Sequence, residues 1–423
     1  MLAKNDFAEL QIHDLTAKGS GVGKIDNFVI FTPYALPGDI LRVKILKVKK
    51  QYAYAKIEKI LVPSIHRIDS VCAVFGRCGG CQFQHFDYNA QLIFKEKLVR
   101  DALTRIAGVE NPPIGSVIGM ENPYNYRNKA QFVATIIDGV QAAGFYAQRS
   151  HRVIPFDSCN IHISEKTIAA VLEKLPPLKS LRHIVVRVGE NTGELMVIFV
   201  MSKLERLPII EQASTVIINI NAENTNVILG KKLQTIQGSG YYHEQIGTIR
   251  YRISPRAFFQ INSKQTKRLY DLILAQFTDA GDERVIDAYC GIGGIALYIA
   301  ASTREVVGVD SVPEAIEDAA HNAQLNNITN AHFICGLAET VIPDLLDECS
   351  TIILDPPRKG CDVKLLDGIM GAKIPRIIYI SCEPTTLARD LKQLTGYKLE
   401  TVQPVDMFPL TGHVEIMAVL HRT

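Results

Sequence analysis

A cysteine lies where a predicted strand passes into a predicted helix, in the last tenth of the chain. The apolar run 377–380 predicts the strand, and Ser381-Cys382-Glu383-Pro384 follows it. Pro384 fits the first position of a helix, where its missing N–H would have no partner anyway. The unpaired amides and partial positive charge of that helix N-terminus favour a thiolate at Cys382. A lone cysteine of this kind is more often simply buried, so a catalytic role depends on the residues that accompany it.

Two carboxylates are expected to face the same cleft as this cysteine. Asp355 closes the predicted strand 351–354, and the two prolines after it stiffen the chain and direct the carboxylate across the sheet edge. Glu415 stands at the start of a terminal strand predicted at 414–420. Arg358 ends the first of these motifs, where enzymes that aminomethylate bases have an aromatic residue and cytosine-C5 RNA enzymes have a nucleophilic cysteine. Both of those classes are therefore disfavoured.

A glycine-rich turn followed by an acid predicts a cofactor of the adenosine type. Asp287-Ala288-Tyr289-Cys290-Gly291-Ile292-Gly293-Gly294 follows the first strand of a predicted parallel sheet, and such a turn brings backbone close to a ligand. Its G-x-G-G spacing departs from the dinucleotide pattern G-x-G-x-x-G. Roughly twenty residues later, Asp310 ends a second strand, where a carboxylate accepts hydrogen bonds from ribose hydroxyls. Nicotinamide and S-adenosylmethionine cofactors both remain open on these residues alone.

Cysteines with close spacing predict a metal site. Cys72, Cys78 and Cys81 form C-x5-C-x2-C with glycines between them, and Cys159 is the nearest candidate for a fourth ligand. Four thiolates suit either zinc or an iron–sulfur cluster, and the spacing does not decide between them. The C-x3-C-x2-C spacing typical of radical S-adenosylmethionine enzymes is absent from this group.

Length and patterning predict a multidomain chain. Its 423 residues and hydrophobic content of 47% are typical of two or three domains with real cores. Residues 7–62 carry short alternating runs separated by glycine turns, which is typical of a small β-barrel. Residues 91–254 have a mixed α+β pattern, and from about 264 helices alternate with strands, which predicts a parallel sheet covered by helices. The turn 18–24 lacks the residues that a phosphate loop requires.

Charge points to the N-terminal unit as the place of contact with a polyanion. The net charge is only +2, but residues 1–66 hold ten Lys or Arg and six Asp or Glu, an excess of four positive charges. Lysines and two tyrosines alternate there, which suits contact with an RNA backbone and stacking on its bases. A solvated strand face is the plainer interpretation. The cations and aromatics concerned are Lys44, Lys47, Lys49, Lys50, Tyr52 and Tyr54.

The sequence predicts a cytoplasmic protein. It shows no secretory signal and no apolar run long enough to span a bilayer, so no membrane contact is expected. In a reducing compartment its nine cysteines are expected to serve metal binding or catalysis rather than disulfides. No obligate protein partner is inferred.

Taken together, these motifs resemble the RNA uracil-C5 methyltransferase family, in its TRAM-containing, iron–sulfur type that makes 5-methyluridine in 23S rRNA. The resemblance covers nearly the whole chain. It includes the cysteine group, central segments 126–129 and 254–262, and the motifs at 287–293, 355–360, 381–384, 404–409 and 413–415. It implies three domains: a TRAM RNA-binding barrel (OB-like) at 1–66, a central α+β domain at 67–254, and a Rossmann-like α/β catalytic domain at 255–423.

The resemblance also implies roles for individual residues. Cys382 is expected to be the nucleophile and Glu415 the general base. Contacts to S-adenosylmethionine are implied for Gln260, Tyr289, Asp310 and Asp355, and a [4Fe–4S] cluster for Cys72, Cys78, Cys81 and Cys159. Asp310 stands where many members have Glu, and Gly294 where some place a cofactor-contacting Asn. Arg127 is expected to contact substrate RNA.

The implied function is S-adenosylmethionine-dependent methylation of uracil C5 in RNA through a covalent adduct between Cys382 and C6. The family's transfer-RNA branch commonly lacks the barrel and the cluster, so ribosomal RNA is favoured over transfer RNA as the partner. Two other interpretations remain. One is a nicotinamide oxidoreductase with an iron–sulfur relay, and the other is a non-catalytic RNA-binding factor that has kept the fold.

Overall fold

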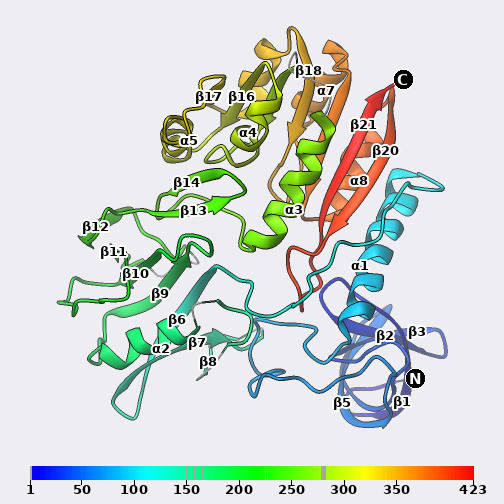
Figure 1. Ribbon diagram of the computed structural model, residues 1–423. Coiled ribbons are helices and arrows are strands. Elements are labelled where there is room, and N and C mark those ends of the chain that lie inside the picture. Colours follow the sequence, from blue (N-terminus) through cyan, green and yellow to red (C-terminus); the bar gives the residue numbers. More distant parts are fainter. Residues whose placement is uncertain are drawn as a thin grey trace.

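The computed structural model describes residues 2–148, 150–156, 159–163, 165–223, 225, 227–277 and 283–423. Figure 1 shows an N-terminal barrel and a long helix on one side, a central sheet on the other, and a second sheet covered by helices above both. Within the described residues, no helix is both long enough and apolar enough to cross a membrane.

The N-terminal barrel closes because its strands alternate inward apolar and outward polar residues. Leu10, Ile30, Leu41, Val43 and Ala53 fill its core and are almost completely buried. The strand order around the barrel is β1-β2-β3-β5-β4, with β3 and β5 parallel. The strands are β1 (Phe7–Leu15), β2 (Ser20–Ile25), β3 (Phe28–Pro33), β4 (Ile40–Val48) and β5 (Tyr52–Val62).

Helix α1 (Tyr88–Ala102) connects the barrel to the C-terminal sheet. It starts at Asp87, whose side chain accepts a hydrogen bond from the Ala90 amide at 3.0 Å and caps the helix N-terminus. Phe94, on its first half, packs with residues of the barrel side. Val99, on its second half, packs into the core of the C-terminal sheet. The helix continues into a π-helical turn, η1 (Leu103–Ala107).

The central unit is a sheet of seven strands in the order β12-β11-β10-β9-β6-β7-β8. Neighbouring strands are antiparallel except β10 and β11. Helix α2 (Glu165–Lys174) accompanies it, and the hairpin β13–β14 forms a separate small sheet. The strands are β6 (Lys129–Ile137), β7 (Val140–Tyr146), β8 (Val153–Pro155), β9 (Leu181–Val188), β10 (Leu195–Met201), β11 (Thr215–Ile220), β12 (Lys232–Gln237), β13 (Tyr242–Ile246) and β14 (Ile249–Ile253).

The C-terminal unit is a second seven-stranded sheet, in the order β17-β16-β15-β18-β19-β21-β20. The first five strands are parallel, as the alternating helices and strands predict. The terminal strand β21 runs antiparallel to both β19 and β20, so the sheet is mixed at this edge. The strands are β15 (Arg284–Ala288), β16 (Glu305–Asp310), β17 (Ala331–Cys335), β18 (Cys349–Leu354), β19 (Arg376–Ser381), β20 (Tyr397–Val405) and β21 (Glu415–Arg422).

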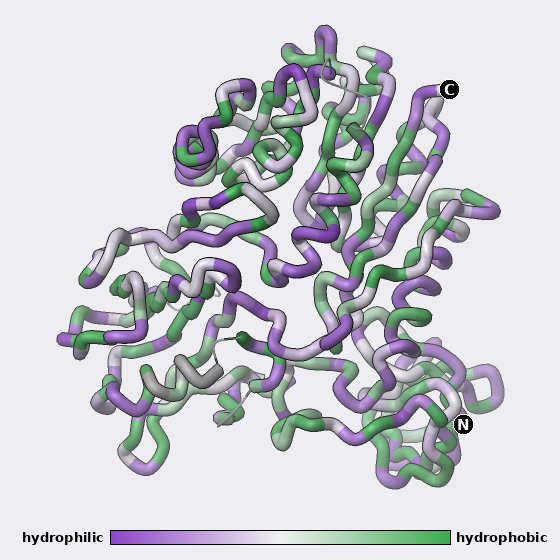
Figure 2. The backbone as a smooth tube through the Cα atoms, in the orientation of Figure 1, coloured by the Kyte–Doolittle hydropathy of each residue, from purple (hydrophilic) through white to green (hydrophobic). Residues whose placement is uncertain are grey.

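Helices cover both faces of this sheet because successive strand residues point to opposite sides. Ile353 and Ile378 pack in one core with α3, α4 and α5, whereas Ile352 and Ile377 pack in another with α7 and α8. Figure 2 shows hydrophobic segments inside the units and hydrophilic segments at outer turns. The helices are α3 (Ser263–Leu274), α4 (Gly294–Ile299), α5 (Pro313–Leu325), α6 (Ala338–Val341), α7 (Val363–Ala372) and α8 (Pro384–Gln393).

Candidate active site

Side chains from four parallel strands meet at one edge of the C-terminal sheet. Tyr289 follows β15, Asp310 ends β16, Asp355 follows β18 and Cys382 follows β19. The carboxyl ends of neighbouring parallel strands lie together, so these residues share one edge. Glu415 reaches the same edge from the opposite direction, because it is the first residue of antiparallel β21. Ser381 pairs with Ile416 there, which places Glu415 beside the position of Cys382.

The environment of Cys382 differs from the one that the sequence predicts. Pro384 does begin α8, so the strand-to-helix junction is as expected. The thiol is nevertheless held in its neutral form, since burial and the nearby Glu415 raise the pKa of Cys382 to about 11. Arg358 opposes this shift through its charge and a hydrogen bond, and Asp355 adds to it. Burial and the carboxylates therefore oppose the thiolate that the helix N-terminus favours.

Two carboxyl groups beside Cys382 favour their protonated forms. Glu415 is 3% exposed, and burial together with Asp355 raises the pKa of Glu415 well above its ordinary value. Arg358 again opposes the shift. Burial raises the pKa of Asp355 to about 7. Perturbed carboxyls that interact with a thiol in one cleft are typical of a catalytic site.

Arg358 acts electrostatically on Cys382 and Glu415, an effect that the sequence does not predict. The loop that carries it is bound to α8, because Thr386 donates a hydrogen bond to the Arg358 carbonyl at 3.0 Å. Its place in the sequence, directly after Asp355-Pro356-Pro357, puts it at the same sheet edge.

Three of the predicted cofactor residues line one pocket. Gln260, Tyr289 and Asp355 meet there with Asp287, which lies near the end of β15. The Asp287 carboxyl is 1% exposed, and its Oδ2 accepts a hydrogen bond from the Ala296 amide at 2.9 Å. Its Oδ1 is buried without a hydrogen-bond partner among the described residues. An acceptor left over in a polar, concave site suits a ligand that brings its own donors, as S-adenosylmethionine does.

Asp310 lies beside this pocket but shapes the glycine turn. Its Oδ2 accepts a hydrogen bond from the Gly291 amide at 3.0 Å, and its Oδ1 accepts one from the Val312 amide at 2.8 Å. Tyr289 itself has a φ of 66°, in the left-handed region that bulky residues rarely occupy. Since a carboxylate has about four acceptor sites, Asp310 retains the capacity to bind a ribose hydroxyl.

The four predicted metal ligands also come together. Cys72, Cys78, Cys81 and Cys159 line one pocket. Burial, together with the neighbouring Cys159 and Cys78, raises the pKa of Cys81 to about 12. Amide donors point at two of the sulfurs: the Gly80 N–H lies 3.4 Å from Cys78 Sγ, and Gln84 Nε2 lies 3.4 Å from Cys81 Sγ.

A metal at these cysteines stays a prediction. No group of three or more His, Cys, Asp or Glu within the described ranges is arranged to hold one metal ion.

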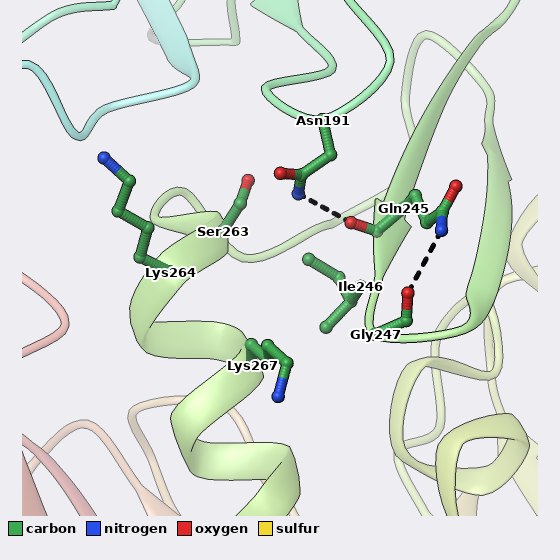
Figure 3. A pocket seen from close by; sticks show the side chains of 7 residues that line it. All are labelled: Asn191, Gln245, Ile246, Gly247, Ser263, Lys264 and Lys267. Atoms are coloured by element: carbon green, nitrogen blue, oxygen red, sulfur yellow. Dashed lines mark hydrogen bonds between the residues drawn. The ribbon is translucent and has the colours of Figure 1, made fainter.

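A further pocket, of about 340 Å³, opens between α3 and the β13–β14 hairpin. Figure 3 shows Asn191 hydrogen-bonded to the Gln245 carbonyl, with Lys264 and Lys267 on the facing helix. The predicted site residues do not line it. Lys264 pairs with Glu190 at 3.2 Å and Lys267 with Asp271 at 2.7 Å, so its cations are neutralised.

Comparison with known proteins identifies the family. Residues 241–423 match the tRNA (Uracil-5-)-methyltransferase family, and residues 7–57 match the TRAM domain. The chain is 44% identical to a Bacillus cereus protein described as an uncharacterized RNA methyltransferase, over 99% of this chain and 97% of the relative. A Halalkalibacterium halodurans protein of the same description is also 44% identical, over 99% and 97%.

A solved structure extends this match to three dimensions. The Pyrococcus abyssi tRNA (uracil-54, C5)-methyltransferase, in complex with S-adenosyl-L-homocysteine, superposes with a TM-score of 0.78 at 28% identity, over 98% of this chain and 100% of that one. These matches favour S-adenosylmethionine over a nicotinamide cofactor. The chain belongs to the TRAM-containing family of RNA uracil-C5 methyltransferases and is an S-adenosylmethionine-dependent enzyme of that family.

Proposed function

We propose that this enzyme methylates uracil through a transient covalent bond between Cys382 and C6 of the base. The observation that carries the proposal is the placement of Glu415 beside Cys382 by the pairing of β21 with β19. A nucleophile and a proton acceptor thus flank one position at the sheet edge. Uracil C5 alone is a poor nucleophile, so an enzyme that methylates it needs such a pair.

Each of the proposed residues acts in a defined step of the methylation reaction. The Cys382 thiol gives its proton to solvent and its sulfur adds to C6, and the electrons displaced from the C5–C6 double bond make C5 nucleophilic. When bound, S-adenosylmethionine supplies an electrophilic methyl group that C5 takes up. Glu415 acts in its ionised form, which Arg358 favours by opposing the rise of the Glu415 pKa. The carboxylate removes the C5 proton, and departure of Cys382 sulfur restores the ring. Arg358 supports the first step because its charge and hydrogen bond favour the thiolate.

The cofactor is assigned to the pocket at the ends of β15 and β18. Gln260, Tyr289 and Asp355 line this pocket, and Asp310 holds the adjoining turn. The Asp355 carboxylate carries a negative charge, which attracts the positive sulfonium of the cofactor. Asp310 is proposed to bind the ribose, as the family resemblance implies.

For the cysteine pocket we propose a [4Fe–4S] cluster held by Cys72, Cys78, Cys81 and Cys159. The shared pocket and the amide donors at sulfur support it. Such a cluster would tie together chain segments that are far apart in sequence. Anaerobic purification should yield a brown protein with iron and acid-labile sulfide in equal amounts. Zinc in a colourless protein would contradict this assignment.

As substrate we propose RNA, with 23S rRNA favoured. The barrel presents cations over an aromatic ring, with Arg42 and Lys44 at 5.3 and 5.5 Å from the Phe7 ring centroid, which suits RNA. Transfer RNA is the second candidate. The Pyrococcus enzyme named for tRNA aligns over nearly the whole of this chain, so a chain of this length does not by itself indicate ribosomal RNA.

Mass spectrometry of nucleosides tests the function. Ribosomal and transfer RNA from cells with and without this protein should be separated, digested and searched for 5-methyluridine. Loss of one or more 5-methyluridines from 23S rRNA is the expected result. Loss from transfer RNA alone would select the second candidate, and unchanged 5-methyluridine in both pools would contradict the proposal.

A further inference from the structure

A turn of the barrel touches the loop that leads to Glu415. This turn comprises Thr16–Gly19 and is closed by a hydrogen bond from the Gly19 amide to the Thr16 carbonyl at 2.9 Å. A Cβ built on Gly412 would lie 1.9 Å from the Ala17 carbonyl oxygen. Only glycine at position 412 allows the two backbones to approach so closely. The contact joins residues at opposite ends of the chain.

The other side of the turn rests on the segment that carries the cysteines. Gly19 has a φ of +76°, and a Cβ there would lie 2.8 Å from Cβ of Gln82. The amides of Gln82 and Phe83 in turn donate to the Leu410 carbonyl at 3.2 and 3.0 Å. Three segments thus meet, and we call residues 16–19, 82–83 and 410–412 the junction. Figure 1 shows the loop between β20 and β21 extending below its sheet towards α1 and the barrel.

The junction borders the catalytic cleft. Gly412 precedes His413, whose ring packs edge-on against Phe408 with centroids 5.9 Å apart. Burial lowers the pKa of His413, and the charges of Arg358, Lys95 and Arg127 lower it further. Arg358 belongs to the catalytic sheet and Arg127 to the central unit, so cations from separate units already surround this position.

Lys18 adds a cation from the barrel. It occupies the turn between Ala17 and Gly19, and its side chain is exposed. Among the described residues Lys18 makes no ion pair, whereas the nearby Lys97 pairs with Asp14 at 2.9 Å. Lys18 follows Ala17, which touches Gly412 three residues before Glu415. In an enzyme that binds RNA, an ammonium without an ion pair has a phosphate as its natural counter-charge.

We propose that the turn Thr16–Gly19 forms part of the wall of the active site, and that Lys18 binds a backbone phosphate beside the target uridine. The inference rests on the proposed function. The barrel thereby contributes to the active-site cleft, since the contacts of the junction hold the turn Thr16–Gly19 beside the loop that leads to Glu415. A base that is extruded from its stack needs its strand held on either side, and a phosphate contact supplies that hold.

The test compares Lys18→Ala with the matched control Lys24→Ala. Lys24 is also an exposed lysine of the barrel. It lies near the far end of β2, where it pairs with Val29 of β3. The extended residues 20–24 of β2 alone span roughly 13 Å. The conservative variant Lys18→Arg keeps the charge. For each protein, kcat and KM for cognate RNA, the Kd for RNA across a salt series, and the Kd for S-adenosylmethionine are measured.

Lys18→Ala is expected to raise KM and Kd for RNA roughly fivefold, leave kcat and cofactor binding unchanged, and reduce the slope of log Kd against log salt by about one. Lys18→Arg and Lys24→Ala should resemble wild type. Equal RNA binding by Lys18→Ala and wild type would overturn the inference. So would an equal loss in Lys24→Ala, since it would indicate only the general charge of the barrel.

A photochemical crosslink provides a second readout. RNA with 5-fluorouridine at the target and 4-thiouridine at the next position is incubated with wild-type enzyme and irradiated. The photo-crosslinked peptide should contain residues 16–19, and crosslinks confined to other segments would overturn the inference. If the wild-type enzyme forms no adduct with 5-fluorouridine at all, the proposed function fails instead, so the two failures are distinguishable.

Discussion

The amine of Lys95 lies 2.5 Å from Oδ1 of Asp406, and both side chains are completely buried. The Tyr88 hydroxyl donates to the other oxygen of Asp406 at 2.7 Å, and Lys95 also donates to the Phe408 carbonyl at 3.0 Å. Helix α1 is thereby joined to the loop that runs from β20 to Glu415. The pair holds the start of this loop, and the junction with the barrel holds its end.

Replacing Lys95 by Met should destabilise the protein strongly. The change leaves Asp406 buried without its cation, which costs about 3–5 kcal/mol. Met keeps the length and helix propensity of Lys, so the loss in free energy of unfolding measures the effect of removing the charge. Unfolding in urea measures the effect. The control is Lys97→Met on the same helix, whose exposed pairs with Asp14 and Asp101 are worth about 1 kcal/mol or less. Equal effects of the two variants would contradict the role of the buried pair.

Replacing Cys382 by Ala should abolish methylation and leave RNA binding nearly intact. Without the sulfur no bond to C6 forms, and C5 stays a poor nucleophile. Turnover with labelled cofactor and RNA affinity are measured side by side. Cys349→Ala serves as control, because this cysteine is also buried but begins β18, at the opposite edge of the sheet from Cys382. Activity of Cys382→Ala within about tenfold of wild type would rule out the covalent route.

Replacing Glu415 by Gln should trap the adduct. The amide fills the same space but does not accept the C5 proton, so methylated base remains bound to Cys382. A denaturing gel should show protein shifted by covalently attached RNA. The matched control is Glu383→Gln, at the N-cap of α8, which should turn over and show no shifted band. Absence of the band in Glu415→Gln would assign the proton transfer to another group.

Much of the site follows from the pattern of strands and turns. Tyr289, Asp355 and Cys382 each follow an apolar run, and runs that alternate with helices form parallel strands whose carboxyl ends share an edge. The sequence therefore predicts their proximity without any coordinates. The cysteines at 72, 78 and 81 were likewise recognisable by local spacing, and the structure places them around one pocket with Cys159.

The remaining features depend on contacts through space. The high pKa of Cys382 arises from burial and from Glu415, and no local motif carries either. Strand β21 lies between β19 and β20 and pairs antiparallel with both, which the sequence of β21 alone does not predict. The approach of Gly412 to Ala17 joins residues almost four hundred positions apart, and a glycine in a loop gives no sign of its partner.

Replacing Arg358 by Ala should make Cys382 less reactive. Arg358 lowers the thiol pKa, which burial otherwise raises to about 11, so its removal raises the pKa further and reduces the thiolate fraction at any given pH. Alkylation of Cys382 by iodoacetamide, followed by mass spectrometry of its peptide from pH 7 to 10, measures this. Lys359→Ala, the adjacent exposed cation, is the control. An unchanged pH profile in Arg358→Ala would show that the guanidinium does not act on the sulfur.

Binding of S-adenosylmethionine should release protons near neutral pH. Burial raises the pKa of Asp355 to about 7, so about half of the ligand-free molecules carry a proton there at that pH. A sulfonium in the same pocket favours the carboxylate, lowers this pKa and drives the proton off. S-adenosylhomocysteine has the same shape without the charge and should release fewer protons. Isothermal titration in two buffers of different ionisation enthalpy counts them. In Asp355→Asn the difference between the two ligands should vanish, whereas an equal count for both ligands with wild type would show that Asp355 does not respond to the sulfonium charge.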